Sequence, residues 1–150
     1  MTKWVLPTME EDVSGSKSWW LNGKLHREDG PAREWADGDK EWWLNDKLHR
    51  EDGPAIEWSN GDKSWYLNGK LHREDGPARE YASGSKFWCL KGKLHREDGP
   101  AIEWANGDKE WYLNDEEVTE EEHKLMTSKV VEMTMEEINK ALGKQVKVVQ

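Results

Sequence analysis

The nine-residue string KLHREDGPA occurs four times in this chain, beginning at Lys24, Lys47, Lys70 and Lys93. Each copy brings together an imidazole, a guanidinium and two carboxylates, groups that can bind a metal ion, transfer a proton or hold an anion. The first candidates for a functional site are therefore the repeat-motif residues His26, Arg27, His49, Arg50, His72, Arg73, His95 and Arg96.

The spacing of the copies argues against metal binding and catalysis. They start 23 residues apart. If each step adds two strands about 4.8 Å apart, equivalent histidines lie about 10 Å from one another, too far to share one metal ion. No serine or cysteine nucleophile recurs, whereas an enzyme assembles one constellation from distant segments. We therefore expect no metal, no cofactor and no catalytic residues, and a protein that is not an enzyme.

The identical residues are expected to hold a scaffold together. We expect the arginine of one step to bridge a carboxylate of the next step, giving a charge ladder along the chain. The aspartate before Gly-Pro is expected to accept hydrogen bonds from nearby backbone N–H groups in a turn. On this interpretation the motif is the joint between structural steps.

Binding is predicted where the copies differ, at variable positions that combine arginine with aromatic rings. Such residues are enriched at the centres of protein interfaces, and they would also suit a nucleotide, with rings on the base and arginine on phosphate. The candidate binding face consists of Arg33, Trp43, Tyr66, Arg79, Phe87 and Tyr112.

The elements that must position these residues follow from the period. Full units begin at Leu25, Leu48, Leu71 and Leu94, with half a unit before them. Two turn signals recur in each unit, such as Asn60-Gly61 and Asn68-Gly69, and both predict two-residue hairpin turns. The sequence thus predicts an all-β, elongated, single-layer array of 23-residue β-hairpin or meander units. We place a lead-in at 1–13, the array at 14–115 and a separate tail at 116–150.

Alternation along the strands predicts which side chains are buried. The invariant columns are expected to form the buried face, the variable residues between them to be half-exposed, and the aromatic column at 35, 58, 81 and 104 to stack on the first. The invariant columns are Trp19, Trp42, Trp65, Trp88 and Trp111, and Leu21, Leu44, Leu67, Leu90 and Leu113.

The tail has a different pattern. Thr119 and Glu122 have the spacing of a capping box and predict a helix over 118–126. Thr134 and Glu137 repeat the signature before a second helix that Gly143 would end, and valines on both sides suggest short strands. We expect a small α/β cap over the last open edge of the array.

Composition and charge limit the function. The eleven tryptophans argue for a folded chain, and the net charge of −9 comes from closely alternating signs, without the basic patch that nucleic acid requires. The single cysteine, Cys89, is typical of a reducing compartment. No apolar run is long enough to span a membrane, and the first residues lack a secretory core. We expect a cytoplasmic protein that binds neither nucleic acid nor membrane.

The stretch GPAIEWSNGDKSWYLNGKLHR resembles the MORN repeats of bacteria and viruses, in the LHREDGPA variant. The resemblance covers about 14–115 and depends on Trp58, Asn60-Gly61, Lys63, Trp65, Tyr66, Asn68-Gly69, Lys70 and His72. It implies a single-layer sheet that serves as an interaction platform, in a protein of phage or viral type.

Three functions follow as hypotheses. The first is a repeat binding module, encoded by a phage, that binds a host protein in the bacterial cytoplasm. The second is a binder that sequesters a nucleotide-type small molecule, and the third is an antitoxin-like partner protein. Open sheet edges would also allow two copies of the chain to pair.

Overall fold

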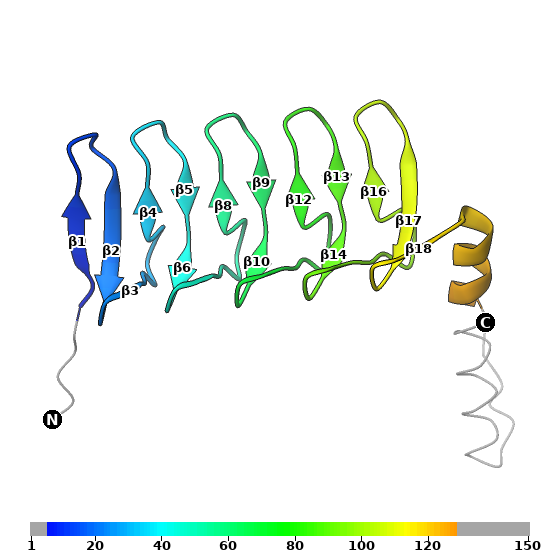
Figure 1. Ribbon diagram of the computed structural model, residues 1–150, viewed down its shortest axis with the longest axis horizontal. Coiled ribbons are helices and arrows are strands. Elements are labelled where there is room, and N and C mark those ends of the chain that lie inside the picture. The colour runs from blue at the N-terminus through cyan, green and yellow to red at the C-terminus, as the bar shows by residue number, and fades with distance from the viewer. Residues whose placement is uncertain (1–5, 129–150) are drawn as a thin grey trace, which may run out of the picture.

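The computed structural model describes residues 6–128, which form eighteen strands and, at their C-terminal end, a helix at 120–128 (Figure 1). Hairpins stand side by side along the long axis of the molecule, and the helix lies beyond the last of them. The predicted all-β repeat array with a small C-terminal helical element is confirmed.

A 12-stranded antiparallel sheet runs through the whole array. Its strands, in spatial order, are β1 (Thr8–Glu11), β2 (Lys17–Leu21), β4 (Arg33–Glu34), β5 (Lys40–Glu41), β8 (Ile56–Glu57), β9 (Lys63–Ser64), β12 (Arg79–Glu80), β13 (Lys86–Phe87), β16 (Ile102–Glu103), β17 (Lys109–Leu113) and β18 (Glu116–Val118), with β3 (Lys24–Leu25) paired to β2. Separate two-stranded hairpins are β6 (Trp43–Leu44) with β7 (Lys47–Leu48), β10 (Tyr66–Leu67) with β11 (Lys70–Leu71), and β14 (Cys89–Leu90) with β15 (Lys93–Leu94). Each unit thus adds two strands to the sheet, a step of about 10 Å.

The two turn signals form different turns. At the second signal Asn68 and Gly69 both have positive φ, 52° and 79°, which is the two-residue hairpin turn that the sequence predicts. At the first signal only the glycine has positive φ, as in Gly38 at 100°. Trp35 there accepts from the Gly38 N–H and donates to the Asp39 carbonyl, both at 2.9 Å. The prediction of a two-residue turn is therefore wrong at this signal, because the loop is longer and needs a single glycine.

Hydrogen bonds between consecutive units fix the step. The Trp42 N–H donates to the Ala55 carbonyl at 2.8 Å, and the His49 N–H donates to the Trp42 carbonyl at 3.0 Å. At the opposite end of the hairpin, the Asp39 carboxylate accepts from the Ser59 N–H at 2.7 Å. All of these bonds recur at equivalent positions along the array, so an inserted residue would break several of them.

The strand register gives the sheet two distinct faces. One carries a row of alternating charge: Lys17, Glu34, Lys40, Glu57, Lys63, Glu80, Lys86, Glu103 and Lys109. This face also bears the invariant tryptophans and is called the motif face. The opposite face, called the variable face, carries the row Ser18, Arg33, Glu41, Ile56, Ser64, Arg79, Phe87, Ile102 and Glu110. Opposite charges on adjacent strands stabilise the first row.

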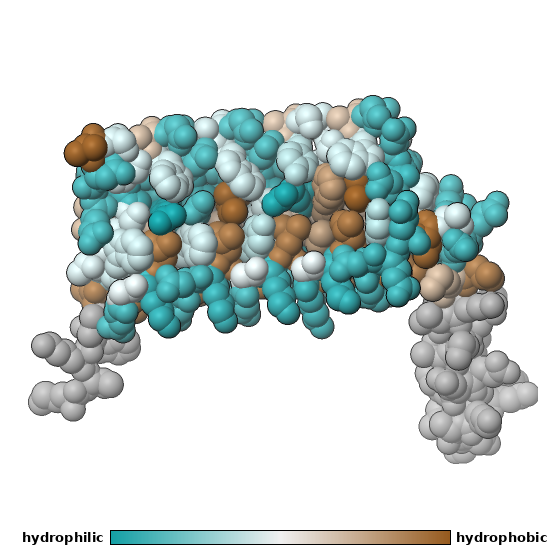
Figure 2. All heavy atoms as spheres, viewed as in Figure 1, coloured by the Kyte–Doolittle hydropathy of each residue, from teal (hydrophilic) through white to brown (hydrophobic). Residues whose placement is uncertain are grey.

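Burial differs from the prediction. The invariant tryptophan and leucine columns are half-buried, whereas the variable face contains Ser64 at 0%, Ile102 at 4% and Cys89 at 5% exposure. Ser64, Ile102 and Cys89 have small or branched side chains, and the larger side chains of the neighbouring columns shield them from solvent. The alanine of each GPA segment is also completely buried, at positions 32, 55, 78 and 101. In Figure 2 hydrophobic side chains gather in a band across the middle of the visible face, framed by hydrophilic ones.

The tail begins with the predicted helix. The Thr119 N–H donates to the Glu122 carboxylate at 2.8 Å, and the Thr119 hydroxyl accepts from the Glu122 N–H at 3.2 Å, so the capping box is confirmed. The second predicted helix and its flanking strands lie outside the described residues. Within 6–128 no helix is long and apolar enough to cross a membrane.

Candidate functional site

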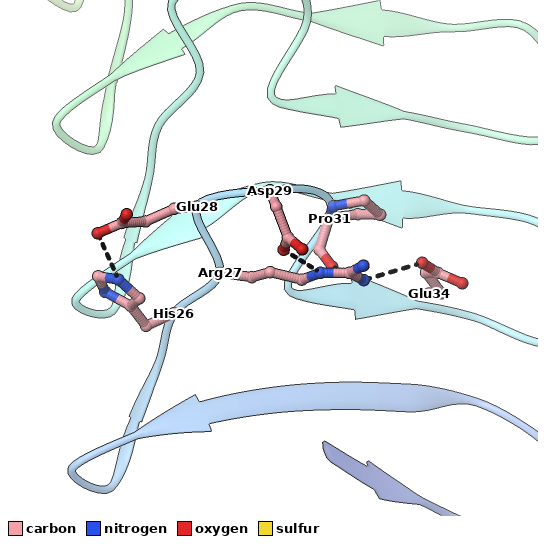
Figure 3. Close-up of polar contacts among 6 residues, drawn as sticks. All are labelled: His26, Arg27, Glu28, Asp29, Pro31 and Glu34. Atoms are coloured by element: carbon pink, nitrogen blue, oxygen red, sulfur yellow. Dashed lines mark hydrogen bonds and ion pairs between the residues drawn. The ribbon is translucent and has the colours of Figure 1, made fainter. Parts of the chain in front are cut away.

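The arginine of each KLHREDGPA copy is held by groups of its own unit. Arg27 Nε donates to Asp29 at 2.8 Å, and Nη1 contacts the Pro31 carbonyl at 3.2 Å and Glu34 at 3.3 Å (Figure 3). In the other copies the corresponding three distances differ from these by at most 0.3 Å. The predicted bridge to the next step is wrong, because the loop folds back over its own strand and brings its own carboxylates to the guanidinium. The aspartate correspondingly accepts from arginine as its main partner.

A tryptophan and a glycine enclose the same guanidinium. Arg27 Cζ lies 4.1 Å from the ring centroid of Trp19, a cation–π contact. On another side, a Cβ placed on Gly30 would be 2.9 Å from Cζ. Gly30 is therefore required for the space it leaves. The Arg and Gly of each unit and the invariant Trp of the unit before it are parts of one contact.

The histidine joins the start of its unit to the hairpin turn at the end of the same unit. His26 Nδ1 accepts from the Asn45 N–H of the following turn at 3.2 Å, and its equivalents do the same. An imidazole nitrogen that accepts from N–H carries no proton, so Nε2 is the protonated nitrogen of the ring. Nε2 points to Glu28 at 3.6 Å (Figure 3). Contacts between units come instead from the backbone and from arginine, since the Trp42 N–H donates to the Ala55 carbonyl and Arg50 lies over the Trp42 ring of the preceding unit.

The ion pairs change the acidity of the aspartates. The hydrogen bond from Arg27 lowers the pKa of Asp29 below its ordinary value, and the charge of Arg27 adds to the effect. The pKa values of Asp52, Asp75 and Asp98 are lowered by the same cause, the hydrogen bond from their arginine. These carboxylates stay ionised and bound to arginine at neutral pH.

Hollows lie between consecutive loops of the motif. Their volumes are about 660, 620 and 660 Å³, and each is lined by the charged residues of two loops together with one tryptophan, one leucine and one histidine. Each hollow thus brings together candidate residues from two consecutive copies of the motif, for example Arg50 with His72 and Arg73. Nε and Nη1 of these arginines and Nδ1 of the histidine are already bound within the protein, and Glu51 and Glu74 of the same hollow are exposed.

On the variable face, Arg79 is the centre of a polar cluster. Its Nε donates to the Ser64 hydroxyl at 2.9 Å, Nη1 to the Tyr81 hydroxyl at 3.2 Å and Nη2 to the Tyr66 hydroxyl at 3.3 Å. Phe87 is its cross-strand neighbour and contacts Tyr81 edge to face at 5.5 Å between centroids. Three of the predicted binding residues, Tyr66, Arg79 and Phe87, are therefore adjacent.

The other predicted residues lie in two separate groups. Arg33 stacks on Trp35 at 5.3 Å and is the cross-strand neighbour of Glu41, which accepts from Trp43 Nε1 at 2.9 Å. Tyr112, near the far end, donates to Glu110 at 3.2 Å. The six candidates thus lie in three groups, and Tyr112 is joined to the group around Arg79 through Glu110, Trp104 and Phe87.

Sequence reasoning missed several members of these clusters. Ser64 and Tyr81 bind Arg79, and Trp104 donates to Glu110 at 2.6 Å and contacts Phe87 at 5.2 Å. The sequence carries a signal for one of these contacts, since Glu41, Ser64, Phe87 and Glu110 occupy the same position in successive units. Pairing Ser64 with its cross-strand neighbour would have found its contact with Arg79, whereas Tyr81 and Trp104 are not register partners of the residues they contact.

Two further features bear on catalysis. Burial raises the pKa of the Cys89 thiol to about 11, so this cysteine is a weak nucleophile at neutral pH. Among residues 6–128 no group of three or more His, Cys, Asp or Glu side chains is arranged to hold a metal ion.

Comparison with known proteins gives no family assignment. No family model matches the chain, and no curated protein matches it. The resemblance to MORN repeats stays a prediction from the residues at 14–115, and a functional proposal has to begin from the two faces of the sheet.

Proposed function

We propose that this protein is a non-enzymatic repeat module that binds a protein partner through the variable face. The observation that carries the proposal is the contrast between the faces. The arginines of the motif face are bound to carboxylates and a carbonyl of their own unit and to a tryptophan of the preceding one. On the variable face Arg33 and Arg79 contact mainly rings and hydroxyls and stay partly accessible to solvent.

The composition of the variable face supports a protein partner. Tryptophan, tyrosine and arginine are the residues that carry most binding energy at protein interfaces. Trp35 and Trp104 are 42% and 39% exposed, which is unusual for large rings in a folded domain and leaves apolar area to bury. A partner that covers this row would contact several units at once.

The same contacts weigh against the other hypotheses. A nucleotide needs a hollow between ring and arginine, whereas the rings beside Arg79 contact each other and its guanidinium. Catalysis would need an activated group, and the raised pKa of Cys89 disfavours one there. The resemblance to viral repeats supports a phage protein that acts on a host protein in the bacterial cytoplasm, and an antitoxin-like partner protein is a special case of this proposal.

The test is affinity capture from bacterial extract with charge-reversed variants. Arg33→Glu combined with Arg79→Glu changes the variable face. Lys47→Glu combined with Lys93→Glu makes the same change of charge at exposed positions of the small hairpins. Circular dichroism and urea unfolding check that every variant is folded, and Arg33→Glu alone serves if the double change unfolds the protein.

The proposal predicts that the captured protein is lost from the arginine variant and retained by the lysine variant. Retention by both variants, or loss from the lysine variant alone, would overturn the assignment to the variable face. Native mass spectrometry of the purified protein provides the other arm. A bound nucleotide that disappears in the arginine variant would replace the proposed function with small-molecule sequestration.

A further inference from the structure

Two arginines of the variable face, Arg33 and Arg79, can be compared directly. Arginine and isoleucine alternate at one position of the units, so arginine returns after 46 residues, and Arg33 and Arg79 each have a serine, Ser18 or Ser64, as cross-strand neighbour. The two arginines therefore have the same strand geometry and the same serine neighbour. Any difference between them comes from the other side chains around them.

The first arginine has a carboxylate on the neighbouring strand. Glu41 is the cross-strand neighbour of Arg33, and Trp43 holds the Glu41 carboxylate in place by a hydrogen bond of 2.9 Å. Trp35, over which Arg33 stacks, offers a ring but no hydroxyl. Arg33 thus has a carboxylate on the adjacent strand of the same face, although no ion pair joins the two.

The second arginine has lost that charge and gained hydroxyls. Phe87 stands where the first unit has Glu41, and Tyr81 and Tyr66 stand where it has Trp35 and Trp20. Within the described part of the chain, Arg79 makes three hydrogen bonds to hydroxyls and no ion pair. In a protein with a net charge of −9, a half-buried guanidinium without a carboxylate partner is unusual.

We propose that Arg79, Tyr66 and Tyr81 form a binding site for an oxyanion, a carboxylate or a phosphate group, that the protein partner presents to the variable face. Each tyrosine hydroxyl accepts from the guanidinium, so its own hydrogen is available to donate to a ligand. The guanidinium and both hydroxyls then offer hydrogen bonds to one anion, and hydrogen bonds to an ionised group are the strong ones.

The surroundings favour an anion over a neutral ligand. Phe87 lies beside the cluster and contacts Trp104 at 5.2 Å, which gives the site an apolar wall on one side. An apolar wall strengthens the attraction between opposite charges, because it lowers the local dielectric constant. The inference rests on the proposed function for the origin of the anion, while the site itself can be tested with simple anions.

The first experiment follows the Nε–H signals of Arg79 and Arg33 by NMR while sodium phosphate or sodium acetate is added at constant ionic strength with sodium chloride. Saturating shifts of the Arg79 signal are expected, and the Arg33 signal is expected to stay close to its starting position. Saturation with phosphate alone identifies a phosphate group as the ligand, and saturation with both anions identifies a carboxylate-type ligand.

Two variants and one control sharpen the result. Phe87→Glu gives the second arginine the carboxylate that the first one has, and the first unit demonstrates that the fold accommodates it. Phe87→Glu and Tyr66→Phe are each expected to weaken anion binding by about tenfold, the effect of one lost charge-assisted interaction. Glu41→Phe, the reverse exchange, is expected to make the Arg33 signal respond.

Equal responses of Arg33 and Arg79, a linear response without saturation, or unchanged binding in Phe87→Glu would each overturn the anion site. Capture of the partner by the same variants separates this inference from the proposed function. If the partner is captured through the variable face but Phe87→Glu leaves capture and anion binding unchanged, the anion site is wrong and the proposed function stands. If anions bind and no partner is captured through this face, the site stands and the proposed function is wrong.

Discussion

The guanidinium carbon of Arg50 lies 4.0 Å from the ring centroid of Trp42, eight residues earlier in the chain. On another side of the guanidinium is Gly53, where a Cβ would come within 2.9 Å of the same carbon. The arginine fills the space between an aromatic ring and a loop backbone, and its nitrogens bind two carboxylates and a carbonyl. One set of contacts thus explains why tryptophan, arginine and glycine are identical in every copy of the repeat.

Gly53→Ala is expected to lower the free energy of unfolding by about 1–3 kcal/mol, because the new methyl group has to displace a guanidinium that is held on several sides. The φ of Gly53 is not positive, so backbone strain does not contribute. In an Arg50→Ala background the same substitution is expected to cost much less. Urea unfolding of both single variants and the double variant measures the coupling.

The control pairs Arg50→Ala with Gly99→Ala, a glycine that faces Arg96 two units away. Effects at separate sites should add to within about 0.5 kcal/mol. If Gly53→Ala and Arg50→Ala also add, the glycine does not leave space for the arginine.

Much of this fold could be predicted from the sequence, because the period of 23 residues and the Asn-Gly turns report directly on backbone geometry. Asn68 and Gly69 adopt the positive φ angles that their types favour. The Thr119–Glu122 capping box is equally local. Each of these features is determined by residues a few positions apart.

The partners of side chains were harder to predict. The motif predicts that Arg27 bridges to the next unit. The loop instead folds back over its own strand, and this depends on the packing of Arg27 against Trp19 and Gly30. The cluster around Arg79 depends on the cross-strand register, which joins Ser64 to a residue 15 positions later. Such contacts follow from the sheet, and the spacing of the motif carries no signal for them.

Asp46 should stabilise the array through its side chain. It occupies a turn position with φ of 62°, where three other units have glycine and the last has Asp115, and its carboxylate accepts from the Leu25 N–H at 2.8 Å. Asp46→Ala keeps the unfavourable backbone and removes the bond, so we expect a loss of about 1–2 kcal/mol. Asp46→Gly removes the bond but relieves the backbone, and a smaller loss is expected in thermal or urea unfolding. An equal loss in both variants would show that the left-handed conformation costs nothing here.

Stability should fall at acidic pH through the motif aspartates. Their arginine partners lower the folded-state pKa below the unfolded value of about 3.9, so the stabilisation is complete above that value and is lost as the pH falls through the lowered pKa. Replacing Asp29, Asp52, Asp75 and Asp98 by asparagine is expected to lower stability at pH 7 and to make it less dependent on pH below about 4. Urea unfolding between pH 7 and pH 2.5 at constant ionic strength measures both, and an unchanged pH dependence would contradict the role of these ion pairs.

His123 should hold the C-terminal helix on the array. Its side chain is only 4% exposed, and Nε2 lies 2.7 Å from the Arg96 carbonyl of the last complete motif. His123→Ala removes this buried contact and is expected to destabilise docking of the helix by about 1–3 kcal/mol, while the capping box keeps the helix start intact. Hydrogen exchange should then become faster over 120–128 and change little in the first units, since each unit contacts only its neighbours. Leu125→Ala, at a side chain that is 54% exposed, is the matched control and is expected to leave exchange nearly unchanged. Faster exchange in the control but not in His123→Ala would mean that the helix is held by its apolar side chains.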